Sequence, residues 1–177
     1  MIKVILVNKN DKIIGQKEKI QAHIDADLHR AFSVLLYNSK GEMLIHKRAN
    51  SKYHCPNMWT NACCSHPTPG ESRNDAAKRR MKEELGYENI KLIKKFTFTY
   101  KKEFDNGLTE NEIDTVFVGF TENNPPKINP DEIQVWKWIS ISELLEDIKL
   151  NRPKYSFWFQ KILAIYYGNK IKRHPSN

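Results

Sequence analysis

Short segments that are hydrophobic or alternate hydrophobic and polar residues predict β-strands along most of the chain. The strands are predicted over residues 2–7, 32–37, 42–47, 92–100, 113–120 and 133–139. Alternation is clearest in the fourth, where Phe96, Phe98 and Tyr100 share one face because successive side chains of a strand point to opposite sides. Residues 38–41 (Asn-Ser-Lys-Gly) are turn formers, so the second and third segments are predicted to form a β-hairpin.

Helices are predicted over residues 72–85, from the capping box Ser140/Glu143 to about residue 148, and from about residue 154 to 167, before Gly168. The first has the clearest pattern: Ala77, Met81 and Leu85 recur every four residues, and Gly86 supplies a C-terminal stop. Strands mixed with a few helices predict an α/β (α+β) sandwich, in which a mixed β-sheet is flanked by helices.

The length of 177 residues fits one domain, which we expect to span residues 1–177 with a frayed polar tail from about 169 to 177. Residues 48–70 show no clear period and are rich in Pro, Asn, Cys and His. A loop of this length inside a compact domain is usually functional. The functional site is therefore expected in this segment.

Composition and cysteine content predict where in the cell the protein is found. No apolar run approaches the roughly 18 residues that span a bilayer, and the N-terminal apolar run lacks the small-residue cleavage site of a signal peptide. The three cysteines, Cys55, Cys63 and Cys64, are odd in number and two are neighbours, which is unlike a disulfide scaffold. These features predict a cytoplasmic protein with reduced thiols and no membrane partner.

The formal net charge of +8 permits two interpretations. A nucleic-acid-binding protein would be basic and would bind with steep salt dependence. Here the basic residues are scattered in short groups, and a positive field also concentrates small anions near a cleft. We expect a small anionic substrate and no nucleic-acid partner.

The loop contains a candidate catalytic thiol. Cys64 and His66 lie two residues apart in the string TNACCSHP (60–67). A thiol near a cationic or metal-bound group has a depressed pKa and becomes a usable base or nucleophile. The alternative is that Cys63 and Cys64 are small buried hydrophobic residues, as free cysteines usually are.

Histidines and glutamates supply candidate metal ligands. His23 and His29 precede the second predicted strand, and His66 lies in the loop. Glu110 and Glu112 are two residues apart at the start of a strand and so project to the same side. Imidazole and carboxylate groups together suit Mn, Mg or Zn, although any lone histidine is more often an ordinary surface or core residue.

The helix after Gly70 resembles the Nudix box, G-x5-E-x7-R-E-U-x-E-E-x-G-U. The matching residues are Glu71, Arg79, Glu83, Glu84 and Gly86, with Met81 at the apolar position and Ser65 where the box has its first glycine. Arg80 replaces the first glutamate of the core, which removes a metal ligand and adds a phosphate-binding fork. Glu84 and Arg80 would then face a hard cation and phosphate oxygens, or else form a surface ion pair.

With further strings, the chain closely resembles type I isopentenyl-diphosphate isomerase, a Nudix-fold enzyme of isoprenoid biosynthesis, from about Val4 to Tyr167. The strings are LHRAFSV (28–34), TNACCSHP (60–67) and ENEID (110–114), with Ala22-His23, Lys47-Arg48-Ala49, Ser51-Lys52 and Arg79-Arg80. Asn57 stands where the family commonly has glycine, which leaves the local turn open.

The resemblance implies isomerisation of isopentenyl diphosphate to dimethylallyl diphosphate through a tertiary carbocation. The implied metal ligands are His23, His29, His66, Glu110 and Glu112 for one divalent ion (Mn2+, Zn2+ or Mg2+), and Glu84 for a Mg2+ on the diphosphate. The implied catalytic residues are Cys64 and Glu112, with Tyr100 beside Glu112 and Trp158 over the hydrocarbon. The implied diphosphate-binding residues are Lys19, Arg48, Lys52 and Arg80.

Several alternatives stay open. Cys63 is a weaker rival for the thiol, and Tyr100 and Trp158 also fit a strand end and a helix core. Which of Cys64 and Glu112 is the acid in the forward direction is open, as is the choice between monomer and homodimer. A Nudix hydrolase of nucleoside diphosphate derivatives is the rival function, which Arg80 disfavours.

Overall fold

The computed structural model describes residues 2–171, with side chains through residue 168. The strands are β1 (Lys3–Val7), β2 (Ile13–Glu18), β3 (His29–Tyr37), β4 (Met43–Arg48), β5 (Trp59–Asn61), β6 (Cys63–Ser65), β7 (Leu92–Glu103), β8 (Thr109–Phe120) and β9 (Ile133–Ile139). The helices are α1 (Lys19–Ile24), α2 (Arg73–Leu85), α3 (Ile141–Leu150), the 3-10 turn η1 (Arg152–Lys154) and α4 (Phe157–Ile171).

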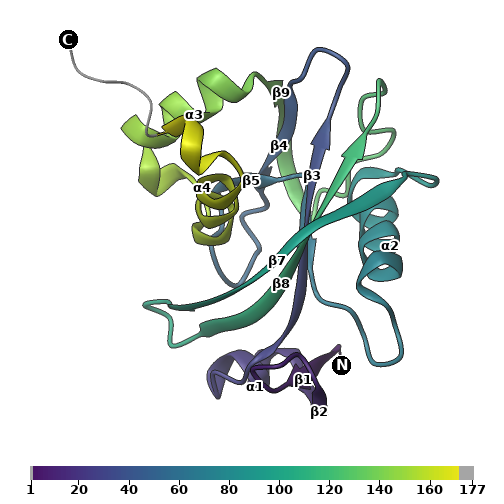
Figure 1. The fold of residues 1–177 in the computed structure, drawn as a ribbon, viewed down its shortest axis with the longest axis vertical. Coiled ribbons are helices and arrows are strands. Elements are labelled where there is room, and N and C mark those ends of the chain that lie inside the picture. Colours follow the sequence, from purple (N-terminus) through teal and green to yellow (C-terminus); the bar gives the residue numbers. More distant parts are fainter. Residues whose placement is uncertain (1, 172–177) are drawn as a thin grey trace.

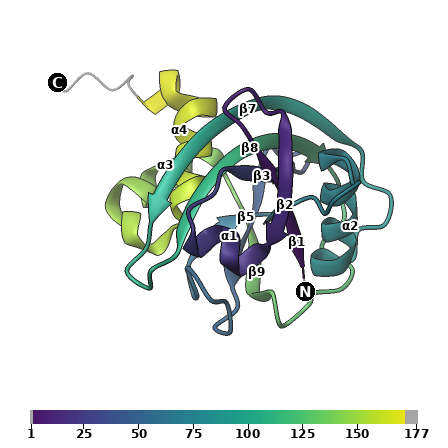
Figure 2. The same cartoon turned by 90° about the horizontal axis from the view of Figure 1, so that it is seen from below.

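All nine strands belong to one mixed sheet, with β3 at its centre. β3 runs parallel to β8 over its whole length, from His29 opposite Glu112 to Tyr37 opposite Phe120. It is antiparallel to β1, β4 and β6, and β7 extends the sheet beyond β8. In Figure 1, α2 lies on one side of these strands and α3 and α4 lie on the other, so the predicted sandwich is confirmed. Figure 2 shows β7 and β8 arching together over the end where α1 lies.

Successive side chains of β3 point to opposite faces of the sheet and pack in two different hydrophobic cores. Phe32, Val34 and Leu36 pack in a cluster with Ala77 and Met81 of α2. Leu35 and Tyr37 pack instead with α3 and α4, in a cluster that contains Leu144, Trp158, Phe159 and Ile162. A central strand that is covered on both faces is buried almost throughout, and this explains the hydrophobic run that predicted it.

Most predicted elements are present, and the differences have simple causes. Residues 48–70, expected to be a loop, contain β5 and β6, whose three residues each are too few to show a period. The predictions omitted β2 and α1, which are also short. α4 continues past Gly168 to Ile171, because a glycine inside a helix costs only about 1 kcal/mol relative to alanine. The expected fraying of residues 172–177 lies outside the described residues.

Two turns depend on left-handed backbone. Gly86 ends α2 at φ 78°, as its sequence position predicted. Asn57, the residue that replaces the family's usual glycine, has φ 61°. Asparagine is one of the few residues that adopts this region readily, so the turn is kept. No helix within residues 2–171 is both long and apolar enough to cross a membrane.

We expect Gly86→Ala to lower the free energy of unfolding by more than Gly107→Ala does. Both glycines have φ near +80°, where alanine pays about 1–2 kcal/mol. A Cβ on Gly86 would also lie 2.7 Å from the backbone nitrogen of Lys127, whereas a Cβ on Gly107 meets nothing within 4 Å. Overpacking should add about 1–3 kcal/mol at Gly86 alone. Urea denaturation measures both variants, and equal losses would contradict the clash.

Candidate functional site

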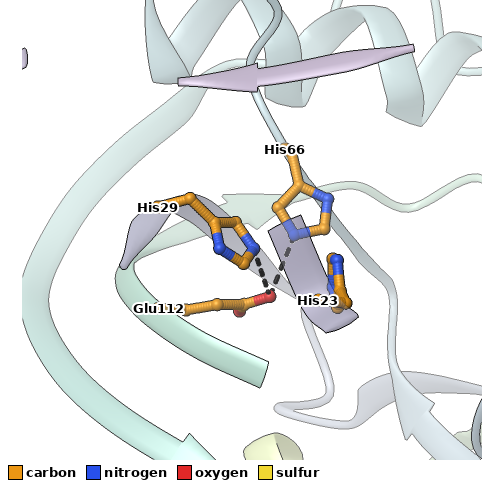
Figure 3. Close-up of side chains that lie close together, drawn as sticks. All are labelled: His23, His29, His66 and Glu112. Carbon is orange, nitrogen blue, oxygen red and sulfur yellow. Dashed lines mark hydrogen bonds and ion pairs between the residues drawn. The ribbon is translucent and has the colours of Figure 1, made fainter. Parts of the chain in front are cut away.

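Four potential metal ligands from four parts of the chain converge beside the start of β3. His23 lies on α1, His29 on β3, His66 just after β6, and Glu112 on β8. One ligand atom from each lies within 4.8 Å of the others, and their side chains point toward one another in Figure 3. His29 and Glu112 are directly paired in the parallel register of β3 and β8. The sheet itself therefore brings two of the four together. We call this set the His/Glu group.

The buried histidines of α1 and β3 are oriented by backbone hydrogen bonds. Nδ1 of His23 lies 2.6 Å from the carbonyl oxygen of Lys19, and Nδ1 of His29 lies 2.8 Å from that of Asp27. A carbonyl only accepts, so each Nδ1–H donates and each Nε2 keeps its lone pair. Neither Nε2 has a hydrogen bond to the described residues. This is the arrangement of metal-binding imidazoles, whose second nitrogen is fixed by an outer partner.

The charge states of the His/Glu group suit a divalent metal. Burial lowers the pKa of His23, and lowers that of His66 to about 3, so both rings are neutral. Glu112 Oε1 lies 2.9 Å from Nε2 of His66 and 3.5 Å from Nε2 of His29. Burial alone would raise the pKa of Glu112, but these two histidines hold it well below its ordinary value. Neutral imidazoles and an ionised carboxylate are donors for Mn2+, Zn2+ or Mg2+.

Glu110, the fifth predicted ligand, is held differently. One carboxylate oxygen accepts a 2.9 Å hydrogen bond from Tyr100, and the other lies 2.8 Å from Nε2 of His54. Burial and then the charge of Glu112 raise its pKa well above the ordinary value. Glu110 is therefore next to the His/Glu group without belonging to it, and its role as a ligand stays a prediction.

Tyr100 joins the two glutamates. Its hydroxyl lies 2.9 Å from Glu110 and 2.8 Å from Glu112. The sequence placed Tyr100 at a strand end, ten residues before Glu110, with a hairpin to connect them. The β7–β8 hairpin does this, and Tyr100 pairs directly with Glu112 across it.

A cavity of about 370 Å³ opens beside the group. Its lining includes the predicted residues Lys19, Arg48, Lys52, Cys64, His66, Arg80, Glu84, Tyr100, Glu110, Glu112 and Trp158. Trp158 is also a buried core residue at the start of α4, and the Arg48 guanidinium lies 5.2 Å from the centroid of its ring. Trp158 therefore both packs in the core and lines the cavity.

The two neighbouring cysteines point to opposite sides of β6. Cys63 is fully buried in the α2 core, with its sulfur 3.5 Å from Oε1 of Glu84. Cys64 packs on the other face and lines the cavity. Burial raises the pKa of Cys64 to about 12, so the sequence-based expectation of a depressed pKa is wrong for this structure. Arg48 lowers it, but by less than burial raises it. Cys64 is consequently a protonated thiol.

Cationic side chains from several elements line the cavity. Lys19, Arg48, Lys52 and Arg80 all line it. Burial, with the charges of Lys52 and Arg80, lowers the pKa of Lys19 to about 8, which shows how crowded the positive charge is. Arg80 donates a 2.9 Å hydrogen bond to Glu84, so the predicted i, i+4 pair exists, but Glu84 is 4% exposed and the pair faces the cavity. Arg80 also contacts Glu132, which in turn pairs with Lys52.

Comparisons with known proteins show the family of this chain. Residues 27–159 match the NUDIX domain family. Isopentenyl-diphosphate Delta-isomerase of Pectobacterium atrosepticum is 42% identical over 164 residues, which cover 93% of this chain and 90% of the relative. Isopentenyl-diphosphate Delta-isomerase 1 of Aromatoleum aromaticum is 44% identical, with 89% and 88% of the two chains covered. The chain belongs to the isopentenyl-diphosphate Delta-isomerase family.

Solved structures agree on the fold of this isomerase family. A crystal structure from Deinococcus radiodurans superposes with a TM-score of 0.73 at 20% identity and covers 93% of this chain and 99% of its own. The MutT protein of Methanosarcina mazei gives a TM-score of 0.61 at 20% identity, with 82% and 96% covered. These similarities confirm the predicted Nudix fold.

The sequence prediction missed several residues that line the cavity of this family member. They are His46, Tyr53, His54, Asp114 and Glu132. Asp114 follows Glu112 by two residues, so the alternation that paired the glutamates would have found it. Its Oδ2 accepts a 2.8 Å hydrogen bond from Ser33, and burial raises its pKa to about 8. Glu132 lies in a connection with no motif, and nothing in the sequence singled it out.

Proposed function

We propose that this chain isomerises isopentenyl diphosphate to dimethylallyl diphosphate by protonation and deprotonation, as a step of isoprenoid biosynthesis. The observation that carries the proposal is one cavity whose lining combines a thiol, a tyrosine-bound glutamate beside the His/Glu group, and a cluster of cations. A catalytic thiol that has to stay reduced also fits the reducing cytoplasm.

The reaction makes specific demands on the site. A proton is added to one carbon of the double bond and another is removed two carbons away, through a tertiary carbocation. Water would capture this cation, so the hydrocarbon has to be enclosed between an acid and a base. The cavity has such a pair in Cys64 and Glu112, which lie on β6 and β8, the strands on either side of the central β3.

In this proposal Cys64 and Glu112 exchange protons with opposite faces of the substrate. The neutral thiol of Cys64 has a proton to give, and ionised Glu112 can accept one. Tyr100 holds Glu112 in place through its 2.8 Å hydrogen bond. Because the reaction is reversible, the two roles exchange between directions, and we leave open which group acts first as acid.

The cation needs stabilisation without capture. The indole of Trp158 lines the cavity, and cation–π attraction to an indole ring contributes about 0.5–2 kcal/mol. The indole carbons have no lone pair that would quench a carbocation. Trp158 therefore fits the role of a wall over the hydrocarbon.

The diphosphate is assigned to the part of the cavity that the cationic side chains line. Lys19, Arg48, Lys52 and Arg80 would contact its oxygens, with Arg80 able to bind two at once. A Mg2+ bound by Glu84 would neutralise part of the diphosphate charge, and a second divalent ion (Mn2+, Zn2+ or Mg2+) at the His/Glu group would fix Glu112. His23, His29, His66 and Glu112 fit that second ion, and Glu110 lies beside them.

NMR of the purified protein with isopentenyl diphosphate and Mg2+ tests the function directly. We expect dimethylallyl diphosphate resonances to appear with no release of phosphate. Phosphate release without isomerisation would support the rival Nudix hydrolase and overturn the proposal. Intact isopentenyl diphosphate after prolonged incubation with added Mn2+ or Zn2+ would also overturn it.

We expect Cys64→Ala to abolish isomerisation, since it removes the thiol that lines the cavity. Cys63→Ala is the matched control: it should keep most of the activity because Cys63 packs against α2 on the opposite face. The same NMR assay measures both variants. Activity retained by Cys64→Ala and lost by Cys63→Ala would reverse the choice of thiol.

Removal of divalent ions should stop the reaction. We expect excess chelator to abolish turnover, and Mn2+ or Mg2+ to restore it, because a diphosphate and a carboxylate-imidazole group both need a hard cation. Elemental analysis of the chelated protein checks that a tightly held ion has gone. Full activity in protein shown to be free of metal would rule out the metal assignment.

A further inference from the structure

His54 is a buried histidine that the sequence prediction did not select. It lies between β4 and β5, is 9% exposed and lines the cavity. Its ring is 4.4 Å from that of Tyr53 and 5.7 Å from that of Trp158, centroid to centroid. The centroid of the His23 ring is 6.1 Å away, so His54 lies beside the His/Glu group without being a member.

Within residues 2–171, the His54 ring makes one polar contact, which is with Glu110. Nε2 of His54 lies 2.8 Å from Oε1 of Glu110, while Nδ1 has no partner among the described residues. A metal-bound Glu110 is an ionised carboxylate that only accepts, so Nε2–H of the neutral His54 ring would donate to it. The Tyr100 hydroxyl lies 2.9 Å from the other Glu110 oxygen. Each Glu110 oxygen thus has a polar contact, one from the sheet and one from the loop.

The loop that supplies His54 is itself held in place. The Arg48 guanidinium donates hydrogen bonds of 3.2 Å to the carbonyl oxygens of His54 and Cys55. Cys55 and Asn57 follow in left-handed backbone, at φ 48° and 61°. The guanidinium that lines the cavity therefore also fixes the backbone from which the His54 ring projects.

We propose that His54 is a positioning residue, whose 2.8 Å contact with Glu110 holds that carboxylate beside the His/Glu group so that Glu110 can complete the donor set for a divalent metal. The inference rests on the metal site assigned under the proposed function. Outer hydrogen-bond partners of metal ligands typically change metal affinity by about 10- to 100-fold when they are removed.

Two substitutions separate the polar contact between His54 and Glu110 from the packing of the His54 ring. His54→Phe keeps a flat ring against Tyr53 and Trp158 but has no donor, whereas His54→Gln keeps an N–H that can reach Glu110. We expect metal-stripped His54→Phe to bind Mn2+ about 10- to 100-fold more weakly than the unaltered protein, measured by titration with electron paramagnetic resonance. His54→Gln should bind within about threefold of it. Equal affinity for His54→Phe and the unaltered protein, or equal losses in both variants, would overturn the role.

His23→Ala distinguishes failure of this inference from failure of the metal site. It should bind Mn2+ much more weakly than any His54 variant, because it removes a ligand. If it binds as tightly as the unaltered protein, the metal site itself is wrong. A weakened His23→Ala together with an unaffected His54→Phe would leave the metal site standing and overturn the role of His54 alone.

A measurement without substitution covers the case in which His54→Phe does not fold. Long-range proton–nitrogen NMR of the Zn2+ form reports which ring nitrogen of each histidine carries hydrogen. We expect His54 to be neutral with hydrogen on Nε2. Hydrogen on Nδ1, or the shift of a metal-bound nitrogen, would overturn the assignment of His54 as a donor to Glu110.

Discussion

The parallel pairing of β3 with β8 is the constraint on which the site depends. Parallel neighbours need a long crossover, and here the chain from Tyr37 to Thr109 makes it, with β4, β5, β6, α2 and β7 on the way. Because side chains alternate, a one-residue slip between β3 and β8 would turn every partner to the wrong face. The register places His29 beside Glu112, and β6, on the other side of β3, places Cys64 opposite Ser33. Cys64 and Glu112, the proposed acid–base pair, thus lie on opposite sides of β3, and the side chains of β3 pack in two cores.

The second constraint is the crowding of like charges around the cavity. Lys19 shares the lining with Arg48, Lys52, Arg79 and Arg80, and its lowered pKa reflects burial together with repulsion by Lys52 and Arg80. Glu84 and Glu132 compensate part of the charge by pairing with Arg80 and Lys52. Such ion pairs contribute little net stability once desolvation is counted, so stability alone does not explain them. A bound diphosphate would relieve the repulsion among these cations.

Sequence patterns predicted the elements that are long enough to show a hydrophobic period. α2 and its end at Gly86 followed from the spacing of apolar residues, and β9 matches its predicted span. The strands of three residues in the Cys-rich loop had no such signal. At the site, matching strings located the His/Glu group, while the raised pKa of Cys64 and the contact of His54 with Glu110 depend on burial and loop geometry. Neither quantity is encoded in residue spacing, so both needed the structure.

Arg80 shows how a conserved fold can serve a different reaction. In Nudix hydrolases the glutamates of this helix hold the metals that assist diphosphate cleavage. Here the guanidinium occupies one of those positions and lies against Glu84 and Glu132, so α2 offers phosphate-binding charge in place of a full carboxylate set. Imidazole and carboxylate groups gather instead beside β3 and β8. In the proposed reaction, the cations would bind the diphosphate while Glu112 takes part in proton transfer at the hydrocarbon, so the phosphate bond would stay intact.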